Sequence, residues 1–327
     1  MRMILLILTC LFAGNALARG DVYRMVAFGD FNGPYGTAGY RTAVLDALNG
    51  IIALQPDLVL FTGDLIAGQD RNLPADRFAE MWQAFDEQIA APLRAAGIAH
   101  AATLGNHDGS SLLDGGEFSY ARERAAAADY WNGRLAQLGV TPLDVAGYPF
   151  NWSFSAGGVF VMVWDASSSQ LAPDATAWVL EQLASPAAAQ ATQRLLLGHL
   201  PLFGISEGRD RPGEVLPDGA GLATRLAAAG LDTYVSGHQA AWYPGSHAGL
   251  ELLMNGGIGA RRLLGTDLAP QSGISIMDIG PDGISYSGVN PETLTPLDPL
   301  QLPASLDAFG GTVYLSCRLP ENPACGQ

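Results

Sequence analysis

The chain has 327 residues, of which 48% are hydrophobic and 15% are charged. This composition supplies enough apolar material for a large core, so it excludes intrinsic disorder as the main state of the chain. The formal net charge is −15, and all 17 basic residues are arginine. An acidic surface repels polyanions, which argues against nucleic acid as the main partner.

The N-terminal segment has the pattern of an export signal. Arg2 provides a positive charge, residues 4–12 are apolar, and residues 16–18 read Ala-Leu-Ala, a cleavage-site pattern. The apolar run is too short to span a bilayer. We therefore expect a signal peptide over residues 1–18, no membrane span after its removal, and a periplasmic or secreted protein.

Strand and helix patterns then alternate along the chain. Short apolar runs that end in glycine predict strands, and longer stretches with helical spacing predict helices. In chain order we expect strands at residues 23–28, 57–62, 100–104, 194–197 and 232–236, with helices at 40–54, 74–96, 117–138, 176–183 and 222–229. Two further β-like runs within residues 150–165 flank an Ala-Gly-Gly turn, and others lie within residues 250–254 and 273–289.

The pattern weakens towards the C-terminus. We expect one domain over residues 19–290 and an irregular extension over residues 291–327, because the extension is rich in Pro and Leu and has little periodicity. Once the signal is removed, Cys317 and Cys325 are the two cysteines that remain. In an exported protein such a pair predicts a disulfide, with two free thiols as the alternative.

Five predicted strands end in glycine followed by a polar residue of a type that binds metals. Each of these short segments is common in ordinary turns, but ligand sites in α/β sheets form outside the carboxyl ends of the strands, where five such ends can converge. Glycine allows the sharp exit from the strand that such a site needs. The segments read G-D-F-N at 29–32, G-D-L-I at 63–66, G-N-H-D at 105–108, G-H-L-P at 198–201 and G-H-Q-A at 237–240.

The ordered set resembles the calcineurin-like metallophosphoesterases, a superfamily that includes the purple acid phosphatases. The family blocks run Asp-x-His, Gly-Asp-x-x, Gly-Asn-His-Asp/Glu, Gly-His and Gly-His-x-His. The resemblance covers residues 22–290 and is closest at residues 105–108. The Asp-x-Asn form of the first block, at residues 30–32, resembles an exported bacterial branch. The resemblance implies an α/β fold with four layers, an α/β/β/α sandwich of two mixed sheets.

The resemblance also implies a site for two divalent metal ions, Mn, Fe or Zn. Asp64 would bridge both ions, and Asn106, His199 and His238 would complete the shell of one of them. Imidazole, amide oxygen and carboxylate together suit divalent transition metals.

The second ion is expected to be bound less firmly. It would share Asp64 and take Asp30, but Asn32 stands where the family has a histidine, and Ala240 replaces the second histidine of the last block. Asn32 can still offer its amide oxygen, whereas alanine offers no ligand atom. His247 is a possible replacement ligand, and a surface histidine is the alternative. We therefore predict one firm metal site and one weakened by Ala240.

The expected chemistry is hydrolysis of a phosphate mono- or diester by hydroxide that the metals activate. In the scheme that the resemblance implies, His107 binds no metal but contacts the phosphate or protonates the leaving alkoxide, with Asp108 orienting it. Asp108 has a second reading, a helix N-cap after the strand, and both roles are compatible.

Other residues are candidates for binding the substrate, which we expect to be a small phosphorylated molecule. Arg261 follows a glycine-rich stretch that can bring a guanidinium near a phosphate, and a solvated pair with Arg262 is the alternative. Tyr35 lies just beyond the first block, where it can line a pocket. Trp242 and Tyr243 follow the last block, and they either stack on a substrate or pack in the protein.

A different class of function competes with hydrolysis. The chain can be a catalytically degenerate metal-binding or interaction protein that retains the fold, which Asn32 and Ala240 favour. The presence of His107 opposes this reading, because a site that has lost its chemistry has no need for a histidine outside the metal shells.

Overall fold

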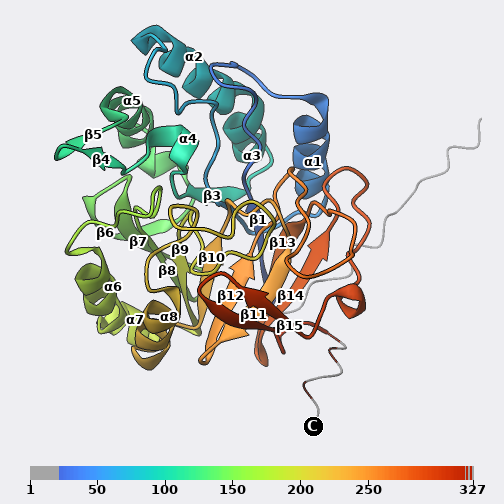
Figure 1. Ribbon diagram of the computed structural model, residues 1–327. Coiled ribbons are helices and arrows are strands. Elements are labelled where there is room, and N and C mark those ends of the chain that lie inside the picture. Colours follow the sequence, from blue (N-terminus) through green and yellow to red (C-terminus); the bar gives the residue numbers. More distant parts are fainter. Residues whose placement is uncertain (1–21, 321, 323–324, 326–327) are drawn as a thin grey trace, which may run out of the picture.

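Two mixed β-sheets face each other in the computed structural model, which describes residues 22–320, 322 and 325. Helices lie outside the sheets, so the predicted four-layer α/β/β/α sandwich is confirmed (Figure 1). Among the described residues, no helix is long and apolar enough to cross a membrane. The predicted signal peptide lies outside the described residues.

The smaller sheet has five strands in the order β14-β13-β1-β2-β3. Its members are β1 (Tyr23–Phe28), β2 (Leu58–Phe61), β3 (Ala99–Ala102), β13 (Ile274–Gly280) and β14 (Gly283–Val289). Strands β1, β2 and β3 are parallel, and their last residues lie in one row, with Phe28 beside Phe61 and Phe61 beside Ala102. The segments that follow these strands therefore leave the sheet at the same edge.

The larger sheet has nine strands in the order β15-β16-β11-β12-β10-β9-β8-β7-β6. Strands β8, β9, β10 and β12 are parallel, so β9 and β10 also end at a common edge. The bounds are β6 (Thr141–Gly147), β7 (Asn151–Ala156), β8 (Val159–Val163), β9 (Gln193–Leu197), β10 (Thr233–Ser236), β11 (Tyr243–His247), β12 (Leu250–Met254), β15 (Ser305–Ala308) and β16 (Gly311–Leu315).

The helices flank the sheets, with α1 to α3 beside the smaller sheet and α6 to α8 beside the larger one (Figure 1). The predicted helix over residues 74–96 is a continuous helical run whose middle, Asp86–Ala90, is π-helical. The bounds are α1 (Thr42–Ala53), α2 (Ala75–Phe85), α3 (Ala91–Ala95), α4 (Asn106–Gly109), α5 (Ala121–Asn132), α6 (Ala175–Leu183), α7 (Pro186–Gln190) and α8 (Gly219–Ala228), with single 3-10 turns at Leu135–Gln137 and Pro299–Gln301.

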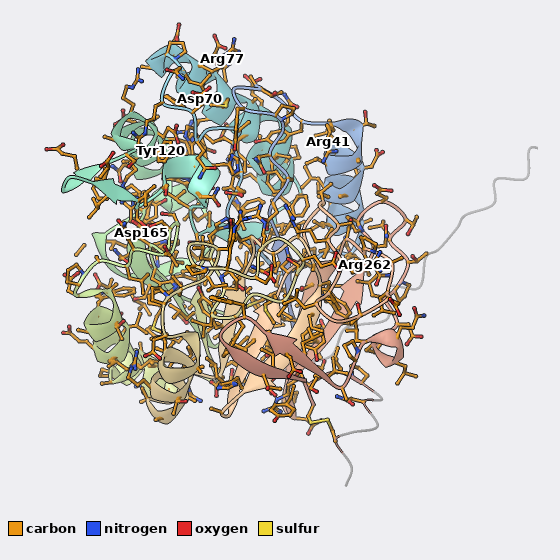
Figure 2. The ribbon with its side chains drawn as sticks, in the orientation of Figure 1. Arg41, Asp70, Arg77, Tyr120, Asp165 and Arg262 are labelled. Carbon is orange, nitrogen blue, oxygen red and sulfur yellow. A yellow bond between two sulfur atoms is a disulfide. The ribbon has the colours of Figure 1, made fainter. Side chains whose placement is uncertain are left out.

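Side chains fill the space between the two sheets (Figure 2). The strands contribute buried aliphatic and aromatic residues, because both faces of each sheet are covered. One polar pair joins the two sheets: the hydroxyls of Thr233 on β10 and Tyr286 on β14 lie 2.7 Å apart. This packing fixes the two strand edges relative to each other.

Two predicted elements differ from the structure. The helix expected over residues 117–138 begins only at Ala121, because the preceding residues form a small hairpin of β4 (Leu113–Asp114) and β5 (Glu117–Phe118) around a Gly-Gly turn. Both glycines of that turn have a positive φ, of 61° and 89°.

The prediction of an irregular C-terminal extension is wrong for residues 305–315, which form the β15–β16 hairpin. Strand β16 pairs with β11, so the hairpin extends the larger sheet by two strands. The predicted disulfide between Cys317 and Cys325 is confirmed. Backbone hydrogen bonds from Ser316 to Pro244 and from Tyr286 to Arg318 hold this segment against the domain.

Candidate metal centre

The ligand-type residues leave their strands through unusual backbone conformations. Asp30, Asp64 and His238 each follow a strand-end glycine and have a positive φ, of 52°, 56° and 69°. L-residues rarely adopt this region, and its cost is accepted mainly at functional sites. Cross-strand hydrogen bonds hold the turns in place, as when the amide of Asp30 donates to the carbonyl of Gly63 over 2.9 Å.

The glycines of these segments permit a close approach of the backbones. A Cβ atom on Gly105 would lie 2.2 Å from Oδ1 of Asp64, and one on Gly237 would lie 2.4 Å from Oδ2 of Asp30. Any larger residue at either position would therefore displace a carboxylate of the site.

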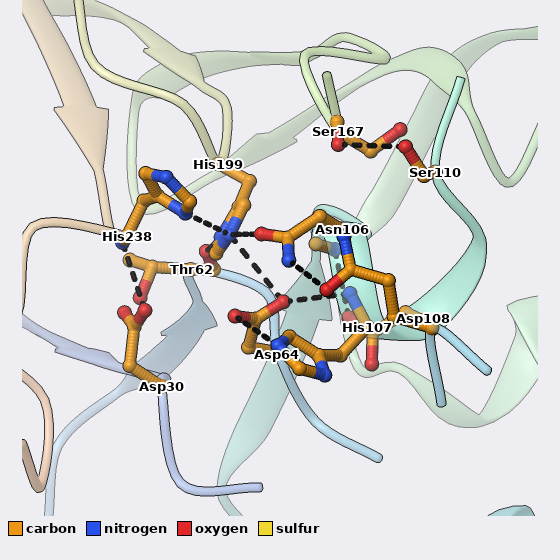
Figure 3. A network of polar contacts seen from close by, with 12 residues as sticks. Asp30, Thr62, Asp64, Asn106, His107, Asp108, Ser110, Ser167, His199 and His238 are labelled. Atoms are coloured by element: carbon orange, nitrogen blue, oxygen red, sulfur yellow. Dashed lines mark hydrogen bonds and ion pairs between the residues drawn. The ribbon is translucent and has the colours of Figure 1, made fainter. Parts of the chain in front are cut away.

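Four side chains from both sheets converge on one point (Figure 3). Nε2 of His199 lies 2.8 Å from Oδ1 of Asn106, 3.2 Å from Nδ1 of His238 and 3.3 Å from Oδ1 of Asp64. One ligand atom from each of Asp64, His199 and His238 lies within 4.8 Å of the others. We call Asp64, Asn106, His199 and His238 together the complete ligand set.

Three of these side chains have their other polar atom held by a neighbour. Nδ1 of His199 lies 2.8 Å from the carbonyl oxygen of Thr62, and Nε2 of His238 lies 2.8 Å from Oε2 of Glu214. A carbonyl oxygen accepts only, so Nδ1 of His199 carries hydrogen and Nε2 of His199 faces the convergence point. Nε2 of His238 lies between the carboxylate of Glu214 and, at 2.5 Å, Nη1 of Arg209, while Nδ1 of His238 faces His199. The Asn106 amide nitrogen donates to Oε1 of Gln69 over 3.0 Å, which turns its oxygen inward.

The donor set fits a divalent metal ion. Ligating histidines commonly donate their second ring hydrogen to a carboxylate or a backbone carbonyl, as both histidines do here. Two imidazole nitrogens, an amide oxygen and a carboxylate are donors that Zn, Mn and Fe accept.

The charged groups at the complete ligand set shift one another's pKa. Burial alone would raise the pKa of Asp64, but His199 and His107 beside it hold that pKa well below its usual range. Burial likewise lowers the pKa of His199, yet the adjacent Asp64 outweighs it and raises this pKa to about 9. Burial lowers the pKa of His238 to about 3, so its ring is neutral. A metal ion would therefore take the place of the His199 proton.

Asp30 and Asn32 lie beside the complete ligand set rather than in it. Oδ1 of Asp30 accepts the backbone amide of His238 over 2.8 Å. Within the described part of the chain, its buried Oδ2 has no hydrogen-bond partner. Burial raises the pKa of Asp30 to about 7, against the positive charges of His199 and Arg209. Asn32 is held nearby by its backbone N–H, which donates to the backbone carbonyl of Asp64. Their roles as metal ligands remain predictions.

We predicted that Asp108 orients His107, but no hydrogen bond joins the two side chains in the described part of the chain. Nδ1 of His107 lies 3.2 Å from the carbonyl oxygen of Gly68, which orients the ring. The predicted orienting role of Asp108 is wrong, because its buried carboxylate accepts three backbone amides, those of Leu65, Ile66 and Gly105, at 2.7–2.9 Å. Asp108 instead holds two of the strand-end segments together. It is the third residue of α4, and its carboxylate accepts the amide of the N-cap residue Gly105, so the alternative reading of Asp108 as the N-cap itself is also wrong.

A cavity of about 440 Å³ opens beside the complete ligand set. Both predicted substrate-binding residues line it: Tyr35, whose ring is 5.3 Å from that of His107, and Arg261, whose Nη1 donates to the carbonyl of Glu207. Three consecutive serines, residues 167–169, line another wall.

The sequence-based prediction missed several residues of the site. Arg209 and Glu214 lie in the loop between β9 and α8, and Glu214 contacts both Arg209 and His238. Their only sequence signal is a dense run of charges, E-G-R-D-R-P-G-E, at residues 207–214. Gln69, which positions Asn106, has no signal that distinguishes it from any loop glutamine.

Other candidates lie outside the centre. His247 is on β11, where Nδ1 contacts the carbonyl of Thr312, so it is not a replacement ligand. Trp242 and Tyr243 are buried packing residues whose polar atoms bond to Ser275 and Pro303. Arg262 pairs with Glu207, and it is not among the residues that line the cavity in the described part of the chain.

Comparison with known proteins identifies the family. The family model of the calcineurin-like phosphoesterases matches residues 20–241. A comparison with curated proteins finds no match.

Solved structures of the same fold include three of low sequence identity. A purple acid phosphatase from yellow lupin (Lupinus luteus) has a TM-score of 0.59 and 18% identity over 85% of this chain, which spans only 53% of the lupin chain. A dimetal phosphatase from Danio rerio has a TM-score of 0.54 and 13% identity over 90% of this chain and 99% of its own. GAP50, the anchor in the inner membrane complex of Plasmodium, has a TM-score of 0.54 and 12% identity, with coverage of 93% and 92%.

Proposed function

The chain belongs to the calcineurin-like phosphoesterases, and from that premise we propose that it hydrolyses a phosphate mono- or diester with a metal ion held by the complete ligand set. The observation that carries this proposal is the convergence of four donor atoms, from Asp64, Asn106, His199 and His238, with the outer atoms of the last three already held by neighbours. Such preorganisation serves no purpose in packing alone.

The protein's own residues would divide the remaining work. A divalent ion bound there supplies an acidified water and withdraws charge from the phosphoryl group. His107 is at the cavity wall, with Gly68 fixing its ring, so it can contact the phosphate or donate a proton to the leaving oxygen. Tyr35 packs on that ring, and Arg261 offers positive charge at the cavity wall.

We further propose that Mn, Fe or Zn is the ion bound by the complete ligand set, and that any second ion beside Asp30 is labile. Imidazole donors favour these metals over Mg and Ca. Ala240 supplies no ligand atom to the second position, and Asn32 supplies at most an amide oxygen.

Export to the periplasm or the medium is part of the proposal. The signal-like pattern of residues 1–18 supports it. The Cys317–Cys325 disulfide also supports it, because such bonds persist in oxidising compartments.

Metal content and turnover, measured together, test the proposal. The purified mature protein is stripped, loaded with Mn, Fe, Zn or Mg singly, and assayed with p-nitrophenyl phosphate and its bis ester while bound ions are counted. We expect metal-dependent hydrolysis that Asp64→Asn abolishes. Asp282→Asn is the matched control, because it makes the same change of charge on an exposed turn. Hydrolysis that survives Asp64→Asn would contradict the assignment.

The second candidate function is a metal-binding or interaction protein without turnover. Asn32 and Ala240 favour it, since both fall on the second metal position. A Plasmodium protein of the same fold is described as the anchor in the inner membrane complex. One tightly bound ion, with no hydrolysis of either ester under any metal, would support this candidate instead.

A further inference from the structure

The position of the second metal ion is short of ligands. Ala240 has a positive φ of 47°, and its carbonyl accepts the amide of Arg261 over 2.7 Å. A Cβ atom on Gly259 would lie 2.8 Å from the Cβ of Ala240, so the glycine-rich segment packs directly against this residue. The acceptor that remains there is Oδ2 of Asp30, which is buried without a hydrogen-bond partner in the described residues. This half of the site has an unpaired carboxylate oxygen but few ligands.

The guanidinium group of Arg209 lies beside His238, at the border of this half of the site. Nη1 of Arg209 is 3.0 Å from Nδ1 and 2.5 Å from Nε2 of His238, and 3.1 Å from Oε2 of Glu214. The backbone amide of His238 in turn donates to Oδ1 of Asp30 over 2.8 Å. The complete ligand set and this guanidinium therefore meet at His238.

The loop that carries Arg209 is fixed to the last block of the site. The buried side chain of Gln239, next to His238, accepts the amides of Ile205 and Ser206 through Oε1 at 2.9 and 3.1 Å. The Ser206 hydroxyl donates to the Gln239 carbonyl over 2.8 Å, and the Arg209 amide donates to the Ser206 carbonyl over 3.1 Å. A cation positioned in advance can stabilise charge without the cost of reorganisation.

The guanidinium also has donor capacity left. Nε of Arg209 is buried, and within the described residues it has no hydrogen-bond partner. Arg209 lines the same cavity as Asn106, His107 and His238. The planar fork of arginine matches two oxygens of a phosphate and keeps its charge at any physiological pH. A phosphate in the cavity would therefore meet a guanidinium whose Nε has no partner among the described protein groups.

We propose that Arg209 is the second cation of this site. One metal ion in the complete ligand set and the guanidinium of Arg209 together bind the phosphoryl oxygens, so that the guanidinium does the work that a second metal ion does in a two-metal site. This inference rests on the proposed function, since it assumes a phosphorylated substrate, but phosphate binding can be measured without turnover.

Binding of inorganic phosphate to the Mn-loaded full chain, measured by calorimetry, tests the proposal. We expect Arg209→Gln to weaken phosphate binding about 30-fold, the size expected for losing hydrogen bonds between charged groups. Arg209→Lys keeps the charge but loses the fork, and it should give a smaller loss of about 5-fold. Arg262→Gln is the matched control: it removes the same charge outside the cavity and should change binding less than about 2-fold.

Counting bound Mn in each variant separates the role of Arg209 from a general defect. About one ion per chain is expected throughout, because Arg209 is no metal ligand. Should Arg209→Gln fail to fold or to bind Mn, the comparison of Arg209→Lys with wild type decides the matter.

Three results would overturn the proposal: phosphate binding that is unchanged in Arg209→Gln and Arg209→Lys, a wild-type protein that binds no phosphate, or two equally tight Mn ions per chain. The proposed function fails differently. Arg209-dependent phosphate binding with no hydrolysis of either ester would support the second cation and count against the enzyme.

Discussion

The metal centre has two halves that share a backbone plan and differ in their side chains. In the complete half, Asp64 and His238 leave their strands with a positive φ and present donor atoms to one point. In the depleted half, Asp30 follows β1 and Ala240 lies two residues beyond His238. Both also have a positive φ, of 52° and 47°, but Ala240 presents only a methyl group. Strained backbone geometry is therefore present in both halves, whereas ligand chemistry is complete in one.

The comparison shows that the backbone conformation of a strand-end turn does not depend on the presence of a ligand side chain. The turn at Ala240 is held by its own backbone hydrogen bond to Arg261 and by the anchoring of Gln239, its neighbour. Neither contact depends on the side chain at position 240. A ligand can thus be lost without collapse of the turn, which leaves room for a cation from another loop to act there.

Removing one ligand from each half should give the largest contrast. His238→Ala is expected to weaken Mn binding more than about 100-fold, beyond the loss typical of outer-shell residues, because it deletes a donor atom. Asp30→Asn should weaken it less than about 10-fold, since its Oδ1 only supports the His238 backbone. Competition with a chelating dye measures both. Equal losses would make Asp30 a principal ligand and erase the contrast between the halves.

An outer contact of the complete half should give a smaller effect. Gln69→Met removes the acceptor that turns the Asn106 amide, and we expect about 10-fold weaker Mn binding with little change in net stability. The same substitution at Gln83, which is exposed on α2, serves as the control. Normal Mn affinity in Gln69→Met would show that Asn106 is held in some other way.

Acidity should shift metal affinity by a comparable or smaller factor. Asp64 raises the pKa of His199 to about 9, so near neutral pH a metal ion must displace one proton from this ring. The ring of His238, with a pKa lowered by burial to about 3, has no proton to release. Mn affinity should therefore rise with pH, by up to tenfold per unit between pH 7 and 8, and level off above about pH 9. A Kd that is flat over this range would contradict the ion pair.

Much of the site could be predicted because each ligand lies next to the strand that positions it. Asp64, Asn106, His199 and His238 are all one residue beyond a strand-end glycine, so strand periodicity and local motif together placed them. The role of Asp108 could not be read in this way. Its hydrogen bonds reach residues 65 and 66, and only the packing of β2 beside β3 brings those amides within range.

The strands without a periodic sequence pattern, β11, β15 and β16, are fixed by pairing with neighbouring strands instead. Strand β11 reads Tyr-Pro-Gly-Ser-His, which carries no strand signal, and it is extended because β12 and β16 pair with it on either side. The β15–β16 hairpin likewise lacks periodicity, and it is held by pairing with β11 and by the mutual backbone hydrogen bonds of Gly204 and Phe309.

The sequence by itself determined the family, the order of the strands that carry the ligands and the gap that Ala240 leaves, because these depend on residues a few positions apart. Only the tertiary structure decided what surrounds that gap. Arg209 and Glu214 reach His238 across 29 and 24 residues of chain, through a loop that the anchoring of Gln239 fixes in space. Such contacts depend on how β9, β10 and their connecting loop pack together, and no short pattern encodes that.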